Sequence, residues 1–170
     1  SDACPSRCAY PRERPAGGVA LTITEGMRVH PTSLGLANTV AAFDDRIVDS
    51  LRTLVDAVHA EGAKLAAQIL HVGRQAGGHN SLSAAWGASA LPWSGTAAIP
   101  HTMTAAEIVE VVHRFGSAAR RVKDAGADAR EIHLGHGPLV QPVLPPANDR
   151  PPDAPAAPPP RPPTARPPAA

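Results

Sequence analysis

The stretch that decides the fold is Glu61–Leu70 (EGAKLAAQIL), in which a Gly-Ala pair separates a helical pattern from the apolar run Leu65–Leu70. The same order recurs at Ala125–Leu134 (AGADAREIHL), with a strand candidate over Ala129–Leu134. Strands that each follow a helix pair in parallel, so the repeat predicts an α/β fold, either a barrel or a doubly wound sheet. No G-x-G-x-x-G motif opens a helix directly after a strand, which argues against a dinucleotide-binding Rossmann fold.

Three further elements are indicated outside this repeat. Val19–Thr24 (VALTIT) is a β-branched apolar run that predicts a strand buried on both faces. Residues 45–61 predict a helix, with Gly62 as its C′ glycine. Thr104 and Glu107 match a capping box, which predicts a second helix ending at Gly126. The apolar stripe of the first helix comprises Ile47, Val48, Leu51, Leu54, Val55 and Val58.

Residues 71–103 lack a clear period and contain both tryptophans among many Gly, Ser and Ala residues. An irregular segment of that length is more often functional than a simple connection. We therefore expect it to contribute to a site.

Composition excludes several classes of protein. The 170 residues carry a net charge of +1, without the basic excess typical of nucleic-acid binders. No run of 18 apolar residues predicts a transmembrane helix, and no apolar stretch after a basic start predicts a signal peptide. Cys4 and Cys8 alone make neither a disulfide framework nor a four-ligand zinc site. We expect a cytoplasmic protein that binds neither nucleic acid nor membrane.

Proline divides the chain near residue 137. Of its 20 prolines, 14 lie in residues 138–170. So much proline prevents helices and central strands, and few large apolar residues are present to offset the ordering entropy. We expect a domain over residues 1–137 and a Pro-rich tail over 138–170, disordered or polyproline-like from residue 145. The tail could bind an SH3-like domain or have no partner.

Polar residues follow the predicted strands at the edge where parallel α/β folds place their active sites. Gln68 is a lone amide in an apolar strand, where it could bind a heterocycle or the neighbouring backbone. His133 and His136 end the last strand and could polarise a carbonyl group or, less plausibly without a third ligand, bind a metal. They could equally be one core and one loop histidine. We predict no metal site.

Three blocks together resemble the old yellow enzyme family of FMN-dependent NAD(P)H:flavin oxidoreductases. They are GGVALTITEGMRVHPTS (17–33), KLAAQILHVGRQ (64–75) and GADAREIHLGHG (126–137). The resemblance implies a (β/α)₈ TIM barrel with FMN at its C-terminal face. It also implies NADH or NADPH as the reductant and an enone or enoyl thioester as the substrate, whose C=C bond receives hydride from the flavin.

The resemblance also assigns roles to individual residues. Gly26 matches a small residue beside the flavin, and Gln68 matches the amide that binds its pyrimidine ring. His133 and His136 match the pair that holds the carbonyl oxygen of the substrate. The proton-donor tyrosine of the family is replaced by Pro138, so no catalytic residue is predicted.

Other departures concern the extent of the barrel. Arg130 stands where the strand pattern favours an apolar residue, so we expect a buried charge without a partner. Only about three βα units match, so we expect a truncated partial barrel whose edges stay exposed. The alternative to an enzyme is therefore a non-catalytic remnant, and homo-oligomerisation is possible for either.

Overall fold

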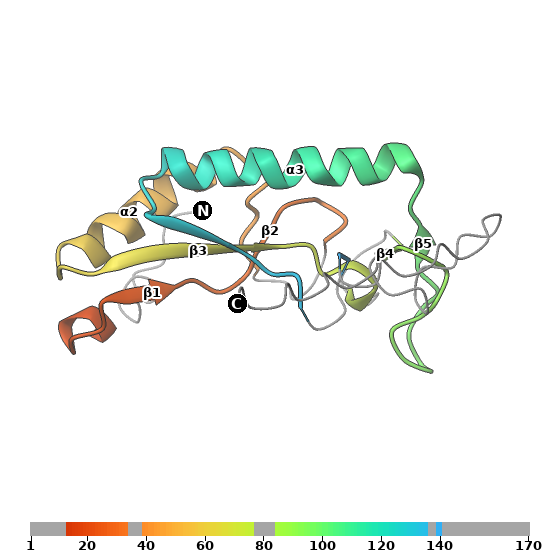
Figure 1. The fold of residues 1–170 in the computed structure, drawn as a ribbon, viewed down its shortest axis with the longest axis horizontal. Helices are drawn as coiled ribbons and strands as arrows, with labels where there is room; N and C mark the ends of the chain where they lie inside the picture. Colours follow the sequence, from red (N-terminus) through yellow and green to blue (C-terminus); the bar gives the residue numbers. More distant parts are fainter. Residues whose placement is uncertain (1–12, 34–38, 77–83, 136–138, 141–170) are drawn as a thin grey trace, which may run out of the picture.

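The structure, a computed structural model, describes residues 13–33, 39–76, 84–135 and 139–140. A helical turn at residues 13–16 precedes the regular elements. Figure 1 shows the two long helices, α2 and α3, on the same side of the main sheet. In chain order the elements are β1 (Leu21–Ile23), β2 (Met27–Arg28), α2 (Ile47–His59), β3 (Lys64–Leu70), η1 (Gly73–Gln75), β4 (Trp86–Gly87), β5 (His101–Thr102), α3 (Ala105–Asp124) and β6 (Ala129–Ile132).

The main sheet is built around β3. β1 and β2 pair with β3 on one side, β6 pairs with it on the other, and every pairing is parallel. The predicted parallel sheet is therefore confirmed. β2 was not predicted, because two residues are too few to show a period. It resumes the pairing with β3 after the chain leaves β1 at Thr24–Gly26.

Both predicted helices are present. Four residues of the predicted apolar stripe, Ile47, Leu51, Val55 and Val58, are buried in α2. Gly62 follows α2 with a φ of +80°, a conformation that glycine adopts without a steric penalty. At the start of α3, Thr104 Oγ1 accepts a hydrogen bond from Glu107 N, and Glu107 Oε2 accepts one from Thr104 N. The capping box is thus confirmed, and it satisfies two backbone donors at the helix terminus.

Alternate residues of β3 face two different environments. Leu65, Ala67 and Ile69 are buried in the core between the sheet and the two helices. Burying a Leu or Ile side chain contributes about 1.5–3 kcal/mol, so this face supplies much of the folding free energy. Gln68 and Leu70 lie on the opposite face, because successive side chains of a strand alternate. That face carries the candidate site.

The expectation that Val19–Thr24 is buried on both faces is wrong. Leu21 and Ile23 pair in register with Lys64 and Ala66, on the face away from the helices. Their side chains are 50% and 47% exposed, respectively. An apolar run shows which side chains could be buried, but burial also needs a second layer. Within the described ranges, that layer exists on the helix side of the sheet.

The expectation that Arg130 is a buried charge without a partner is also wrong. Arg130 is exposed, and its Nε donates a hydrogen bond of 3.0 Å to the backbone oxygen of Ala119 in α3. β6 has β3 on one side, so a long side chain on its helix face can reach water past α3.

The segment predicted as irregular contains a second, small sheet. β4 and β5 pair in parallel, and His101 N donates to Ala85 O at 2.7 Å beside them. Pairing of this kind joins residues about 15 positions apart and leaves little periodic signal in two-residue strands. Trp86 of β4 packs on a second hydrophobic cluster that consists of Met103, Val111 and Leu139.

The predicted domain boundary at residue 137 remains a prediction. Leu139, just beyond it, is buried, and its N–H donates to the backbone oxygen of His71 at 3.3 Å. The tail from residue 145 and the two cysteines, Cys4 and Cys8, lie outside the described residues.

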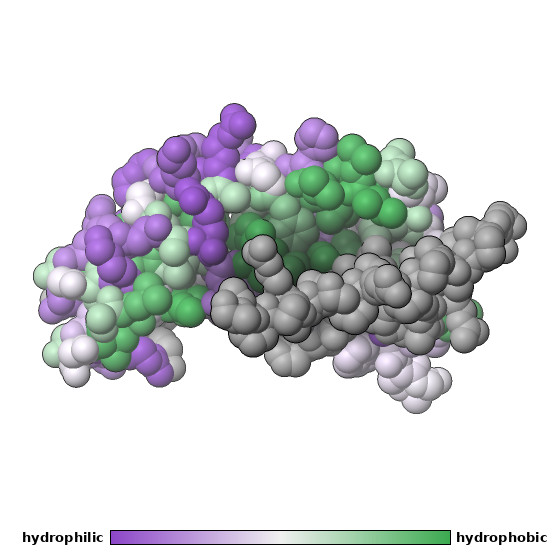
Figure 2. Space-filling model, viewed as in Figure 1, coloured by the Kyte–Doolittle hydropathy of each residue, from purple (hydrophilic) through white to green (hydrophobic). Residues whose placement is uncertain are grey.

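Large hydrophobic side chains remain exposed in several parts of the structure, among them Ile99 before β5 and Ile132 in β6. Figure 2 shows exposed hydrophobic surface along the first half of α3, where Ile108, Val109 and Val112 are exposed, and over β1. Among the residues that the structure describes, no helix has the length and apolar character needed to span a membrane.

Candidate functional site

The candidate site lies where β1 and β3 reach their C-terminal ends. Gly26 lies three residues after β1, and Gln68 lies two residues before the end of β3. Thr24 holds the two strands together there: its N–H donates to Ala66 O, and its Oγ1 accepts from Gln68 N at 3.1 Å. The ends of β1 and β3, which the sequence analysis singled out for their polar residues, therefore lie side by side.

Gly26 allows β3 side chains to approach its backbone closely. A Cβ atom at this position would lie 1.9 Å from Leu70 Cδ2 and 3.0 Å from Gln68 Oε1. Any side chain would therefore displace the end of Leu70 and crowd the Gln68 amide. The absence of a side chain at Gly26 keeps the amide oxygen against bare backbone at the edge of the sheet.

Gln68 is half-buried and bonded through its nitrogen. Its Nε2 donates a hydrogen bond of 2.5 Å to Glu131 Oε1 on β6. Gln68 and Glu131 are directly paired in the register of β3 and β6, so they share one face of the sheet. Within the described part of the chain, Gln68 Oε1 has no hydrogen-bond partner. The sequence analysis allowed a hydrogen bond from this amide to the neighbouring backbone. Its nitrogen instead bonds to the side chain of Glu131.

His133 reaches the same edge, one residue beyond β6. Its N–H donates to Ile69 O at 3.0 Å, which extends the pairing of β6 with β3. His133 and Glu131 lie on the same face as Gln68 by strand alternation. His136 and Pro138 are outside the described residues, so the geometry of the predicted histidine pair stays a prediction.

The sequence analysis missed a chain of hydrogen bonds that runs from the buried His71 to Glu110, whose side chain is 42% exposed. Nδ1 of His71 accepts from Gly73 N at 3.0 Å, so Nε2 carries the hydrogen and donates to Thr32 Oγ1 at 3.1 Å. Thr32 Oγ1 then donates to His30 Nδ1 at 2.7 Å, and His30 Nε2 donates to Glu110 Oε1 at 3.2 Å. The chain links the loop after β2, the end of β3 and helix α3.

Both histidines in this chain of hydrogen bonds, His30 and His71, are buried. His71 is 1% exposed, and Trp86 lies over the rings of His30 and His71. Burial, and secondarily the nearby His30, lowers the pKa of His71 to about 3. The His-Pro-Thr-Ser sequence at 30–33 could have signalled a turn with side-chain hydrogen bonds, but nothing local connects it to residue 71.

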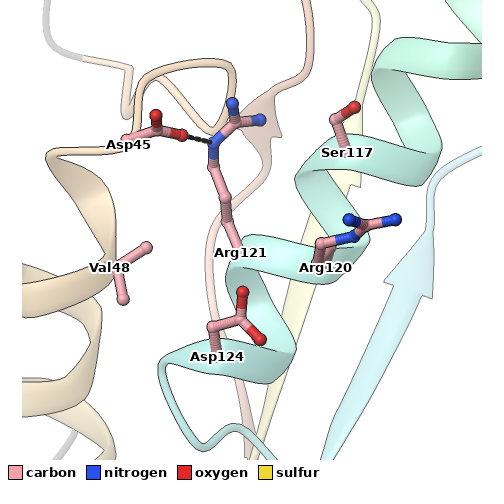
Figure 3. A pocket seen from close by; sticks show the side chains of 6 residues that line it. All are labelled: Asp45, Val48, Ser117, Arg120, Arg121 and Asp124. Carbon is pink, nitrogen blue, oxygen red and sulfur yellow. Dashed lines mark hydrogen bonds and ion pairs between the residues drawn. The ribbon is translucent and has the colours of Figure 1, made fainter.

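A hollow between α2 and α3 is a poorer candidate. Arg121 points toward Asp45 across it and donates from Nε to Oδ1 at 2.5 Å (Figure 3). The other lining residues are Val48, Ser117, Arg120 and Asp124. Its charges thus largely balance, and it opens on the helix side of the sheet rather than at the strand ends. In the described ranges, no cluster of three or more His, Cys, Asp or Glu side chains could hold a metal ion.

Comparison with known proteins places this geometry in context. The chain is 36% identical over 141 residues to an NADPH dehydrogenase of Geobacillus sp. (strain WCH70), and 37% identical over 137 residues to one of Listeria innocua. These matches cover 83% and 81% of the chain but 40% of each relative, so the chain spans less than half of their length.

The structure also resembles solved barrels. It matches morphinone reductase in complex with tetrahydroNAD with a TM-score of 0.79 and 26% identity, over 89% of this chain and 47% of that one. The expected fold class, part of a (β/α)₈ barrel, is therefore confirmed. Residues 4–153 match the model of the NADH:flavin oxidoreductase / NADH oxidase family, whose cofactor is FMN. With nine-tenths of its length inside that match, the chain belongs to the NADH:flavin oxidoreductase / NADH oxidase family.

Proposed function

We propose that the chain binds FMN beside Gly26 and Gln68 and takes part in an ene-reductase reaction. Such a reaction transfers hydride from NADH or NADPH to the C=C bond of an α,β-unsaturated carbonyl compound, and bound FMN would supply its redox chemistry. The observation that carries the proposal is the placement of Gly26 against the Gln68 amide at the C-terminal edge of a parallel sheet. This edge is where barrels of this class hold their ligands.

The residues present suit a flavin. The pyrimidine edge of a flavin alternates hydrogen-bond donors and acceptors, and an amide can complement both. Gln68 offers an oxygen without a hydrogen-bond partner among the described residues, and this oxygen lies against Gly26, where a side chain would clash with Leu70 and crowd the amide. FMN, when bound, would supply the capacity to accept hydride from a nicotinamide and to release it to an enone.

The histidines would act on the substrate. Imidazole N–H groups of His133 and His136 would donate hydrogen bonds to the carbonyl oxygen. This draws electron density from the conjugated C=C bond and favours hydride addition at the β-carbon. The position in the family that delivers the proton is Pro138, which has no acidic hydrogen. The proton would therefore come from solvent, and we expect turnover well below that of a chain with a tyrosine there.

Pro138 also favours a second candidate, a family member without catalytic activity. In that case the flavin edge would persist while enone reduction would not occur. Binding and turnover therefore have to be measured separately.

Flavin retention is the first test. The purified chain is incubated with FMN and passed through gel filtration, and flavin absorbance is read in the protein peak. We expect co-elution for the wild type and roughly tenfold weaker binding for Gln68→Ala, because a hydrogen bond to the ligand is lost. Gln75→Ala is the matched control, since Gln75 lies in η1, beyond the residues of β3 that pair with β1 and β6. Absence of flavin from the wild-type peak would refute the proposal.

Turnover is the second test. NADPH oxidation is followed without oxygen in the presence of 2-cyclohexenone, and the reduced ketone is quantified. Flavin binding without ketone formation would support the non-catalytic candidate. The elution volume of the same gel filtration reports whether the chain forms the homo-oligomer that the sequence analysis allowed.

A further inference from the structure

We propose that Glu131 is a positioning residue that sets which atom of the Gln68 amide faces the ligand. The inference rests on the proposed function, because the ligand is the flavin at the Gly26 edge. Glu131 lies on β6, opposite Gln68 in the strand register, and its Oε1 is 2.5 Å from Gln68 Nε2. No role for Glu131 follows from its place in the sequence, where it reads as one polar residue of a strand.

The chemistry of the pair determines the orientation of the amide. A carboxylate offers acceptors alone, whereas a glutamine amide has one end that donates and one that accepts. Gln68 must therefore turn Nε2 toward Glu131, because the flipped amide would place two oxygen atoms against each other. Charge-assisted hydrogen bonds of this kind are about twice as strong as neutral ones, so the preference is firm.

The consequence appears on the other side of the amide. With Nε2 held by Glu131, Oε1 lies beside Gly26, 3.0 Å from the position that a Cβ would take. A lone glutamine could offer either end to a ligand, but this one presents an acceptor. The site would therefore favour a ligand edge that carries an N–H donor, such as the imide N–H of the flavin pyrimidine ring.

A nuclear magnetic resonance experiment tests the orientation without any ligand. The chain has three glutamines, Gln68, Gln75 and Gln141, so the side-chain signals of Gln68 are identified by their loss in Gln68→Ala. We expect one Nε2 hydrogen of Gln68 to be shifted downfield and to exchange slowly with water. Glu131→Ala should abolish both effects, whereas Glu131→Gln should restore them in part, because its amide oxygen can still accept.

A double-mutant cycle on FMN affinity tests the positioning role. Glu131→Ala should raise the Kd for FMN roughly tenfold in the wild type and less than twofold in Gln68→Ala, because Glu131 acts through the amide. Glu131→Ala should also reduce the preference for FMN over its N3-methyl analogue. Glu25→Gln removes the carboxylate next to Gly26, which among the described residues makes no hydrogen bond to the Gln68 side chain, and it serves as the charge control. Urea unfolding verifies that each variant folds.

The outcomes separate the two proposals. An unshifted Gln68 signal that Glu131→Ala leaves unchanged would overturn the positioning role even if FMN binds. An equal loss of FMN affinity in both backgrounds would do the same, since it would mark Glu131 as a general structural residue. A shifted signal that depends on Glu131, in a chain that does not bind FMN, would refute the proposed function and its flavin-positioning role, and would leave only the amide orientation.

Discussion

Mild acid should destabilise the fold through His71. This side chain is buried, and its Nδ1 already accepts the Gly73 N–H while its Nε2–H is given to Thr32. A proton on Nδ1 would face the Gly73 N–H and break that hydrogen bond. The imidazolium would also lie next to His30, whose ring centre is 5.9 Å away. The folded state therefore resists protonation of His71.

The size and sign of the effect follow from linkage. The pKa of His71 falls from 6.5 to about 3 on folding, so between these values the unfolded chain binds a proton that the folded chain does not. The contribution of His71 to the free energy of unfolding is therefore fully present well above pH 6.5 and is lost as the pH falls from 6.5 toward 3. Between pH 7.5 and pH 5 the loss from this one group is about 2 kcal/mol. That is a large fraction of the 5–15 kcal/mol typical of a domain.

Urea unfolding at about pH 7.5, 6.5, 5.5 and 5.0 measures this loss. All four values lie above the ordinary pKa of carboxyl groups, about 4, so carboxyl titration contributes little. Trp86 lies over His71 and reports on this region by fluorescence, and far-UV circular dichroism provides a second probe. His71→Asn keeps an acceptor for Gly73 but cannot titrate, so its free energy of unfolding should lack this part of the pH dependence. His113→Asn changes an exposed histidine on α3 and should retain it.

The test compares how steeply the free energy of unfolding depends on pH in the wild type and in His71→Asn. Equal pH dependence in the wild type and His71→Asn would show that His71 is not the group that titrates, and the reasoning from its burial would fail. A variant that is merely less stable at every pH does not count in favour, because losing the hydrogen bond to Thr32 alone has that effect.

Three other predictions concern stability and are measured by urea unfolding. Thr104→Ala should cost about 1 kcal/mol, because it removes the cap of α3, and Thr104→Ser should recover most of it. Val58→Ala should cost about 2 kcal/mol, because Val58 is fully buried between α2 and the sheet; a cost near zero would contradict the described core. Asp128→Asn should cost about 1–2 kcal/mol at neutral pH, because Asp128 binds Lys64, His59 and the Leu65 N–H. These contacts hold the pKa of Asp128 well below its usual range, so its contribution to stability should be present above about pH 4 and decrease as the pH falls further. If the free energy of unfolding of Asp128→Asn falls as steeply below about pH 4 as that of the wild type, this reasoning is refuted.

The elements that sequence predicted well are those with local signals. α2 and α3 follow from apolar residues at helical spacing, and the cap at Thr104 follows from two residues three positions apart. β3 follows from a continuous apolar run. By contrast, β2, β4 and β5 have two residues each and exist because of pairing with distant strands. These strands form only in the assembled fold, so a short stretch of sequence carries no signal for them.

The candidate site shows the same division. Gly26 and Gln68 could be singled out from the resemblance to a family, and the structure brings them together. The bond from Gln68 to Glu131 joins residues 63 positions apart, and the one from Thr32 to His71 spans 39. Such pairs become visible once the strand register is known. Arg130 was misjudged for the related reason that its exposure depends on which elements cover β6.

The two faces of β3 explain how one short strand can serve both stability and chemistry. Its odd-numbered residues, Leu65, Ala67 and Ile69, are apolar and buried against the helices. A polar side chain there would lose its hydrogen bonds to water at a cost of a few kcal/mol. Gln68 escapes this cost because it lies on the other face, where Glu131 satisfies its nitrogen. The amide in an apolar strand is therefore compatible with the core, and it lies on the face where we propose that the ligand binds.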